Sequence, residues 1–374
     1  MNVALPAISA DLGATTATAD CRERSRTVPD AMRRHRWWIV RTLVLPVHIA
    51  VFATLSFFLV RLVPGDPVLS ALEGADTITP EDYDRAAEAM GLSGSVWGQL
   101  GTFWAGLVRL DLGTSTVTGR PIWQEIWDRL PATVELVLVG LGGAVVLALV
   151  LGLVLLRVRN RAVQKVLRGY ARLAGAVPDF AVAILGLVLL YGTLRVIPAP
   201  IGRISPGMRL PDVTGFPILD SLVTGSWAVL GSMLGHLALP VAVMVLVYTP
   251  TIWKQLVLGL DESAAAPATL FRIASGAGRV AVYTSILRRA AASAVVMVGA
   301  LFGGLVGGVV VLEQLFGLGG IGQFAIDSVE SVDFLGLQGF LVVIAALCLV
   351  AFFAVDIVNM LLDPRRRPGA SADV

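Results

Sequence analysis

The sequence predicts an all-α polytopic membrane protein with six transmembrane helices, and three observations support this fold class. The mean hydropathy is +0.79, and 56% of the residues are hydrophobic while only 15% are charged. Six stretches are apolar over roughly 20 residues, the helical length that crosses a hydrocarbon core of about 30 Å. Lys and Arg gather in alternate connections between these stretches. The bilayer is therefore the expected solvent of this chain.

We expect the six spans at 42–60, 134–156, 174–194, 237–253, 290–312 and 335–355. Pro64, Gly65 and Asp66 end the first span, because Pro cannot continue the helix, Gly admits a turn and Asp can cap the segment beyond. Before the second span, Pro131 or Thr133 suits a helix start. The segment between these two spans should be partly embedded in the membrane, with its four Trp side chains at the headgroup level.

Prolines disturb the third and fourth spans. Pro178 and Asp179 stand at the start of the third span, and Pro240 and Pro250 lie in the fourth. Such breaks are tolerated where protein or a watery cavity supplies hydrogen-bond partners. Pro178 and Asp179 are therefore candidates for a translocation path, with simple helix kinks as the alternative.

The fifth and sixth spans carry small residues and a few polar ones. Five glycines of the fifth span form a face that permits close helix packing, namely Gly299, Gly303, Gly304, Gly307 and Gly308. Glu135 in the second span and Asp356 in the sixth are close enough to an end to reach an interface. We expect structural roles for both carboxylates.

A glycine-rich turn follows the fifth span. Glu313 and Gln314 precede Gly317, Gly319, Gly320 and Gly322. This cluster predicts a re-entrant or tightly turning outer gate, because glycine adopts the positive dihedrals that such a turn can require.

The charge distribution predicts the orientation. Of the 29 Lys and Arg residues, 21 lie in the amino end, the second and fourth connections and the tail. By the positive-inside rule this side is cytoplasmic, and both termini with it. The basic excess follows from membrane topology, so we expect a lipid bilayer and no nucleic acid as its partner.

We therefore divide the chain into three parts. Residues 1–36 are rich in Ala, Thr, Asp and Arg without a helical or strand period, which predicts a disordered cytoplasmic extension. Residues 37–367 form the transmembrane domain, with an external segment at 61–133 and a cytoplasmic loop at 254–289, and residues 368–374 form a cytoplasmic tail.

The cytoplasmic loop 254–289 is far longer than two adjacent helices require. Pro267 can open a short helix with an apolar patch, and Gly276 with Gly278 can end it. A helix held crosswise by two turns predicts a docking element. Its candidate residues are Leu270, Phe271, Arg272, Ile273, Ala274, Ser275, Gly276, Ala277 and Gly278.

No enzyme chemistry is visible in the sequence. It contains no GxxxxGK[ST] phosphate loop and presents no Ser/His/Asp or His/Glu constellation. Cys21 lies in a polar tail and Cys348 inside the sixth span, so neither a disulfide nor a shared metal site is reasonable. We expect no catalytic residue, no metal and no cofactor on this chain, so energy must come from a partner.

A series of motifs resembles one protein family. "RLVPGDPV" (61–68), "MGLSGSVWGQL" (90–100), "LDLGTSTVTGRPIWQEIWDRLPATVEL" (110–136), "VPDF" (177–180), "GHLALP" (235–240), "VVVLEQLFGLGGIGQFAIDSV" (309–329) and "DIVNMLLDPRRR" (356–367) occur in this order. They are similar to the inner-membrane permease subunits of bacterial ABC importers for dipeptides, oligopeptides and nickel. The resemblance covers residues 37–367.

The resemblance implies a type I ABC importer permease fold and a multi-protein assembly. Its expected partners are a second homologous permease, two cytoplasmic ATPase subunits that bind ATP and Mg, and an extracytoplasmic substrate-binding protein. The family's frequency favours peptide as substrate, although selectivity there lies largely in the binding protein. The loop 254–289 corresponds to the coupling helix that sits in a groove of the ATPase, and Ala274, Gly276, Arg289 and Ala291 match its pattern.

The sequence departs from the family pattern at two positions, and two alternative functions compete with this interpretation. Ser275 replaces a usual basic residue, and Ala294 replaces a usual Pro. The opening "MNVALPAISADLGAT" resembles a motif of proton-driven multidrug exporters, which would normally show twelve or more spans with internal repeats. A non-transporting membrane scaffold is the other alternative, but it would not need the outer glycines and the crosswise loop.

Overall fold

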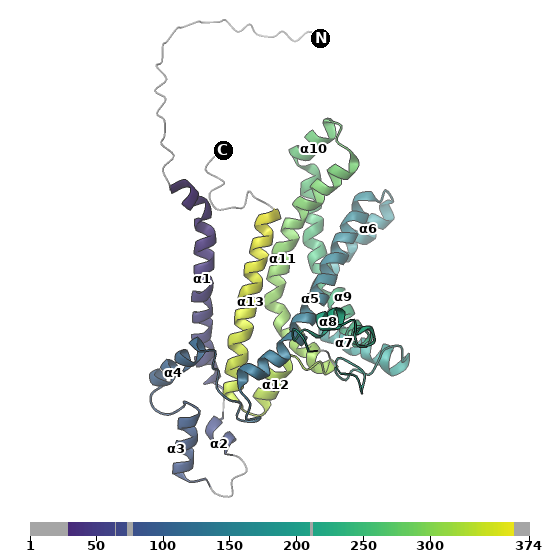
Figure 1. Cartoon of the computed structure of the whole chain (residues 1–374). Helices are drawn as coiled ribbons and strands as arrows, with labels where there is room; N and C mark the ends of the chain where they lie inside the picture. Colours follow the sequence, from purple (N-terminus) through teal and green to yellow (C-terminus); the bar gives the residue numbers. More distant parts are fainter. Residues whose placement is uncertain (1–28, 64, 73–77, 210–211, 363–374) are drawn as a thin grey trace, which may run out of the picture. The chain divides into compact units, whose positions relative to one another are not determined.

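The computed structural model describes residues 29–63, 65–72, 78–209 and 212–362 (Figure 1). The regular structure of these ranges is helical, and their one pair of extended residues is an isolated bridge between Thr114 and Pro121. The predicted all-α class is confirmed.

The chain divides into two units, Met1–Thr42 and Leu43–Val374. The described residues of the first unit form the beginning of α1 (Pro29–Val60), so a helix begins inside the stretch 1–36 that we expected to be disordered. Residues 1–28 and the predicted tail 368–374 lie outside the described residues. All contacts below belong to the second unit.

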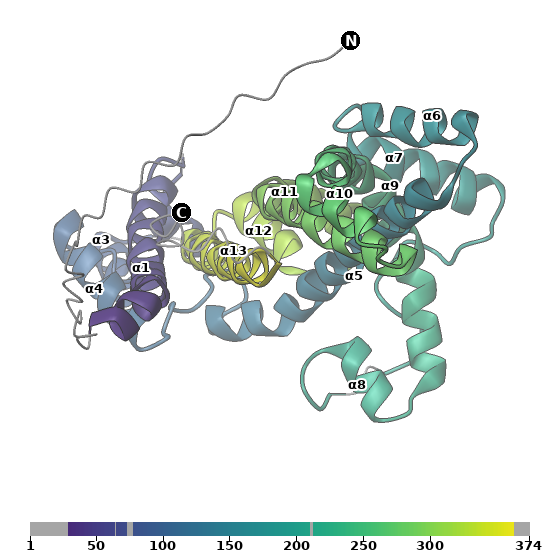
Figure 2. The same cartoon turned by 90° about the horizontal axis from the view of Figure 1, so that it is seen from above.

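Five helices in the described ranges are long and apolar enough to cross a membrane. They are Thr42–Val60 of α1, α5 (Ile122–Arg157), α9 (Trp227–Ala265), α11 (Arg279–Phe316) and α13 (Phe334–Leu362). Each contains one predicted span. Seen along the helices, α11 lies between α13 and α9 (Figure 2), consistent with its extensive contacts to both.

The remaining predicted span is short. Its helix comprises α7 (Asp179–Gly186) and a π-helical continuation over Leu187–Thr193. It begins five residues later than the expected start at 174. Gly175 has a φ of +68°, and the residue before Pro178 is biased away from helical dihedrals, so the backbone cannot become helical before Asp179.

The break expected before the second span is wrong, because α5 runs through both Pro131 and Thr133 without interruption. Proline removes one backbone donor, which leaves the carbonyl of Trp127 without its helical partner. Trp127 is 52% exposed, so this side of the helix is accessible to groups outside the bundle that can satisfy the carbonyl.

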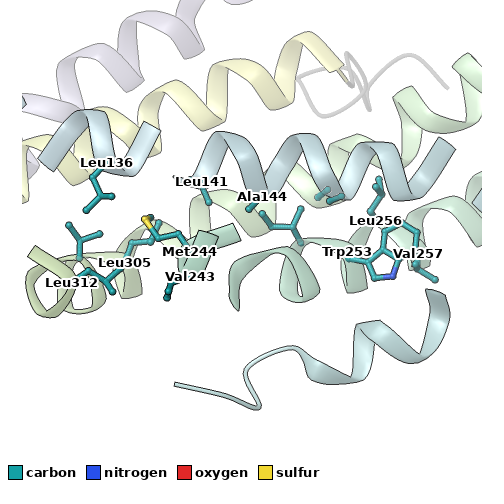
Figure 3. Packing of buried hydrophobic residues seen from close by; sticks show 14 of the residues in the cluster. Leu136, Leu141, Ala144, Val243, Met244, Trp253, Leu256, Val257, Leu305 and Leu312 are labelled. Carbon is teal, nitrogen blue, oxygen red and sulfur yellow. The ribbon is translucent and has the colours of Figure 1, made fainter. Parts of the chain in front are cut away.

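The core of the bundle lies where α5, α9 and α11 pack together. Leu136 and Leu141 of α5, Val243 and Met244 of α9, and Leu312 of α11 belong to one buried cluster (Figure 3). Small residues permit the close approach of the helices. A Cβ on Gly259 of α9 would lie 2.9 Å from the Cα of Ala290 on α11, so only glycine fits there.

The glycines on this face of α11 differ in their surroundings. A Cβ on Gly299 would lie 2.9 Å from Val355 of α13, which confirms close packing at this position. At Gly304 and Gly307, no atom of the described chain lies within 4 Å of such a Cβ. Gly308 faces neither α13 nor open space, but the side chains of Asp179 and Tyr248.

Short helices flank the bundle on the predicted outer side. They are α2 (Pro67–Ala71), α3 (Pro80–Ala89), α4 (Val96–Val108), α8 (Pro217–Val223) and α12 (Ile321–Glu330). Asp66 caps α2 by accepting hydrogen bonds from the backbone N–H groups of Val68 and Leu69, as predicted. The ring centroids of Phe57 on α1 and Phe103 on α4 lie 5.6 Å apart, so α4 packs against the end of the first span.

Candidate functional site

Glu313 organises the turn that follows α11. Its side chain is fully buried, and its Oε1 accepts a hydrogen bond from the hydroxyl of Thr133 on α5 at 2.5 Å. Its Oε2 accepts from the backbone N–H of Gly322 at 2.8 Å and of Gln323 at 3.3 Å. The carboxylate thus satisfies free N–H groups of the first turn of α12, where a negative charge is stabilised.

The predicted glycines make this arrangement possible. Gly317 ends α11 with a φ of +57°, and Gly319 has a φ of +67°. Cβ atoms on Gly320 and Gly322 would strike the carboxylate of Glu313, and the one on Gly322 would also lie 2.8 Å from the Cα of Val310. The structure therefore brings Glu313 and the four glycines together, whereas the side chain of Gln314 is exposed. Their role as a gate remains a prediction.

A buried ion pair lies next to this turn on α5. Glu135 forms a salt bridge with Arg203 of the segment between α7 and α8, and both side chains are less than a tenth exposed. The other carboxylate oxygen accepts from the backbone N–H of Ile218 at 2.7 Å. Glu135 therefore has the structural role that we expected, but it fastens Arg203 and Ile218 to α5 instead of reaching a lipid interface.

Asp179 lies at a junction of three helices. It opens α7, and its Oδ2 accepts a hydrogen bond from the hydroxyl of Tyr248 on α9 at 2.9 Å. A Cβ on Gly308 of α11 would strike this oxygen and would lie 2.9 Å from the Tyr248 hydroxyl. Asp179 thus meets the fourth and fifth spans, whereas Pro178 is an exposed residue at the start of the helix.

The predicted docking helix exists as α10 (Pro267–Ala274), which joins the ends of α9 and α11 (Figure 1). Pro267 opens it as predicted. The turn after it contains Gly276, whose φ is +74° and whose N–H donates to the carbonyl of Ile273 at 3.1 Å. Residues 275–278 are therefore the turn into α11, and the helix itself ends at Ala274.

α10 exposes large apolar side chains on one face, and hydrogen bonds attach its other face to α9 and α11. Leu270, Phe271 and Ile273 are 56%, 73% and 55% exposed, although all three are large and hydrophobic. Thr269, on the inner side, is 1% exposed and donates its hydroxyl to the carbonyl of Ser263 on α9 at 2.6 Å. The guanidinium of Arg289 on α11 donates to the same hydroxyl oxygen.

The two clusters lie at opposite ends of α11. This helix has 38 residues, which at 1.5 Å per residue corresponds to about 57 Å. The turn at Glu313 and the docking helix α10 therefore form no common site. Across the described part of the chain, no group of three or more His, Cys, Asp or Glu side chains could hold a metal ion.

Sequence reasoning missed the partners of the predicted residues. Four such partners are Thr133, Tyr248, Thr269 and Arg203. The sequence marks them only as helix or charge signals, or not at all. A hydroxyl or guanidinium within an otherwise apolar segment or loop is the signal that could have marked them, but the sequence does not indicate which group each would meet.

Comparison with known proteins agrees with this architecture. Residues 144–368 match the family described as "Binding-protein-dependent transport system inner membrane component". The chain is 30% identical over 334 residues to a probable D,D-dipeptide transport system permease protein of Escherichia coli, covering 89% of this chain and 96% of the relative. It is 26% identical over 330 residues to a dipeptide transport system permease protein of Alkalihalophilus pseudofirmus, covering 88% and 98%. A dipeptide transport system permease protein of Escherichia coli is 26% identical over 329 residues, covering 87% and 96%.

Proposed function

Since the chain belongs to the binding-protein-dependent transport system inner membrane components, we propose that it forms half of the path by which peptides enter the cell. It is a multi-pass permease subunit of an ABC importer, a transport subunit and not an enzyme. This family membership sets aside both alternatives, the proton-driven antiporter and the non-transporting scaffold.

The single observation that carries the peptide assignment is similarity along nearly the whole chain. The three relatives above are all named as dipeptide or D,D-dipeptide transport permeases, and each aligns over at least 87% of this chain. The similarity extends well beyond residues 144–368, so it favours a shared type of cargo as well as a shared fold.

The energy source in this proposal is a pair of cytoplasmic ATPases that bind ATP and Mg. This chain has no phosphate-binding loop of its own. A second homologous permease would complete the path, and an extracytoplasmic binding protein would deliver the peptide. Both termini of this chain would be cytoplasmic, in agreement with the 21 of 29 basic residues on that side.

α10 is the proposed contact with the ATPase. Three large apolar side chains that are more than half exposed are costly in water, and a groove of a partner would cover them. The two hydrogen bonds of the Thr269 hydroxyl attach α10 to both α9 and α11. A displacement of α10 on ATP binding would therefore move the two long helices together and shift the permease between its inward-open and outward-open states.

Co-expression with the candidate ATPases, second permease and binding protein tests this proposal. The complex should co-purify, and proteoliposomes that contain it should import Ala-Ala only with ATP. Ile273→Asp should remove the ATPase from the complex, because a carboxylate in an apolar groove costs on the order of a few kcal/mol. Val166→Asp is the matched control, since Val166 is 71% exposed on α6 (Arg161–Tyr170), outside α10.

The two halves of the proposal have separate outcomes. ATPase retention at the wild-type level in the Ile273→Asp variant would contradict the docking role of α10. ATP-driven import of a different solute, with no import of peptides, would contradict the peptide assignment alone.

A further inference from the structure

The carboxylate of Asp179 lies within the membrane-spanning helices. Its partner Tyr248 is eleven residues from the start and five from the end of the predicted span 237–253, and Gly308, which borders the carboxylate, is four residues from the end of the predicted span 290–312. Thr249, which follows Tyr248, donates its hydroxyl to the carbonyl of Ala144 at 3.4 Å, near the middle of the predicted span 134–156. Asp179 is therefore a carboxylate inside the spans, and ionisable groups at such positions usually serve ions, protons or substrates.

This carboxylate accepts two hydrogen bonds from described residues. Oδ2 accepts from the Tyr248 hydroxyl at 2.9 Å, and Oδ1 accepts from the backbone N–H of Phe180 at 2.8 Å. Among the described residues, no Lys or Arg forms a salt bridge with Asp179. A carboxylate offers about four acceptor positions, so each oxygen can accept a further hydrogen bond.

The backbone in front of Asp179 is non-helical and accessible from outside the helix bundle. Residues 174–178 are non-helical, and four of them, Gly175, Ala176, Val177 and Pro178, are exposed. Non-helical backbone at membrane depth is stable only where protein buries it or a watery cavity solvates it. An exposed segment of this kind, leading to a half-buried carboxylate, fits the wall of an aqueous path.

The carboxylate is also held in one orientation. Tyr248 and Phe180 each bind one oxygen, and Gly308 leaves the space that the carboxylate and the tyrosine hydroxyl occupy together. Residues from the third, fourth and fifth spans thus hold a single carboxylate in place. A group that can donate to its remaining acceptor positions is a primary ammonium, which has three donors.

We propose that Asp179, oriented by Tyr248, binds the positively charged amino terminus of the peptide as it crosses the membrane. This inference rests on the proposed function, because the amino group of a peptide has a pKa near 8 and is mostly protonated at neutral pH. It assigns this chain a part in selectivity, in addition to that of the binding protein.

The test compares import of Ala-Ala with import of N-propionyl-alanine, which lacks only the amino group, by the complete complex in proteoliposomes. Asp179→Asn should lower Ala-Ala import at least tenfold and bring its rate close to that of the analogue. Gly308→Ala should also lower Ala-Ala import, because its methyl group displaces the carboxylate and the tyrosine hydroxyl. Gly304→Ala is the matched control and should keep import, since its methyl group would enter open space.

Co-purification of the complex separates binding from assembly. If both Asp179→Asn and Gly308→Ala assemble and import Ala-Ala at the wild-type rate, the site is contradicted. If both variants fail to assemble while Gly304→Ala assembles, the carboxylate holds subunits together and the site is likewise contradicted. If the wild-type complex imports another solute but neither of these two, the peptide proposal fails, and the site with it.

Discussion

The hydroxyl of Thr133 on α5 donates to the carboxylate of Glu313 on α11 at 2.5 Å, and its oxygen accepts the backbone N–H of Ile321 on α12 at 2.9 Å. One buried threonine therefore connects three helices where α11 ends. The two residues are 180 positions apart in the chain. The geometry of the glycine turn depends on this contact, because it positions the carboxylate that receives the first N–H groups of α12.

The first prediction concerns Gly322. Gly322→Ala should abolish import while the complex still assembles, because the new methyl group would lie 2.8 Å from both the Glu313 carboxylate and the backbone of Val310. Gly231→Ala on α9 is the control, since no atom lies within 4 Å of its added methyl group. Normal import by the Gly322→Ala variant would reduce the turn to an ordinary loop.

The second prediction concerns orientation. In a background in which Cys21 and Cys348 are replaced by Ser, Val117→Cys should react with an impermeant maleimide from outside intact cells. Val166→Cys should react only after the cells are opened. Both positions suit the reagent because the two valines are 59% and 71% exposed. Labelling of both from the same side would refute the predicted topology.

The third prediction concerns the attachment of α10. Thr269→Val keeps the shape of the side chain but removes the donor to Ser263 and the acceptor of Arg289. Leaving such buried groups unpaired costs on the order of 1–3 kcal/mol. We expect the ATPase to remain bound while fewer peptides are imported per ATP hydrolysed. Thr102→Val, at an exposed position of α4, should leave this ratio unchanged.

The fourth prediction concerns pH and the external segment before α8. Burial alone would raise the pKa of Asp220, but hydrogen bonds from Thr214 and from the backbone N–H groups of Val213, Thr214 and Gly215 outweigh it and place the pKa below its usual value. A lowered pKa means that the carboxylate stabilises the folded segment above the unfolded pKa of about 3.9, and that this stability is lost as pH falls through the folded pKa.

Amide hydrogen exchange measures this effect. The amides of Val213 to Gly215 should stay protected between pH 7 and pH 5 and lose protection only below about pH 4. In an Asp220→Ala variant the same amides should exchange quickly at every pH. Loss of protection already at pH 6 in the wild-type protein would contradict the assignment of Asp220 as the group that stabilises this segment.

The spans could be predicted because each depends on local composition. Twenty apolar residues must become a helix in lipid wherever they stand in the chain, and Pro267, Gly276 and Gly317 act on the backbone of their own neighbourhood. The site partners could not be predicted in this way. Glu135 forms a salt bridge with Arg203, which is 68 positions away in the chain, and Asp179 accepts a hydrogen bond from Tyr248, which is 69 positions away. These contacts depend on how the helices pack. The path of α5 through Pro131 was mispredicted for a similar reason, since the exposure of Trp127 decides whether its carbonyl can do without a helical donor.

The short helix Asp179–Thr193 has a consequence for the surrounding lipid. Fifteen helical residues extend about 22 Å, which is less than a hydrocarbon thickness of about 30 Å. The non-helical residues 174–178 complete the crossing, and acyl chains cannot satisfy their backbone N–H and C=O groups. In the assembled transporter, protein or water should therefore replace lipid along this part of the third span, so that fewer acyl chains border it than border the longer spans.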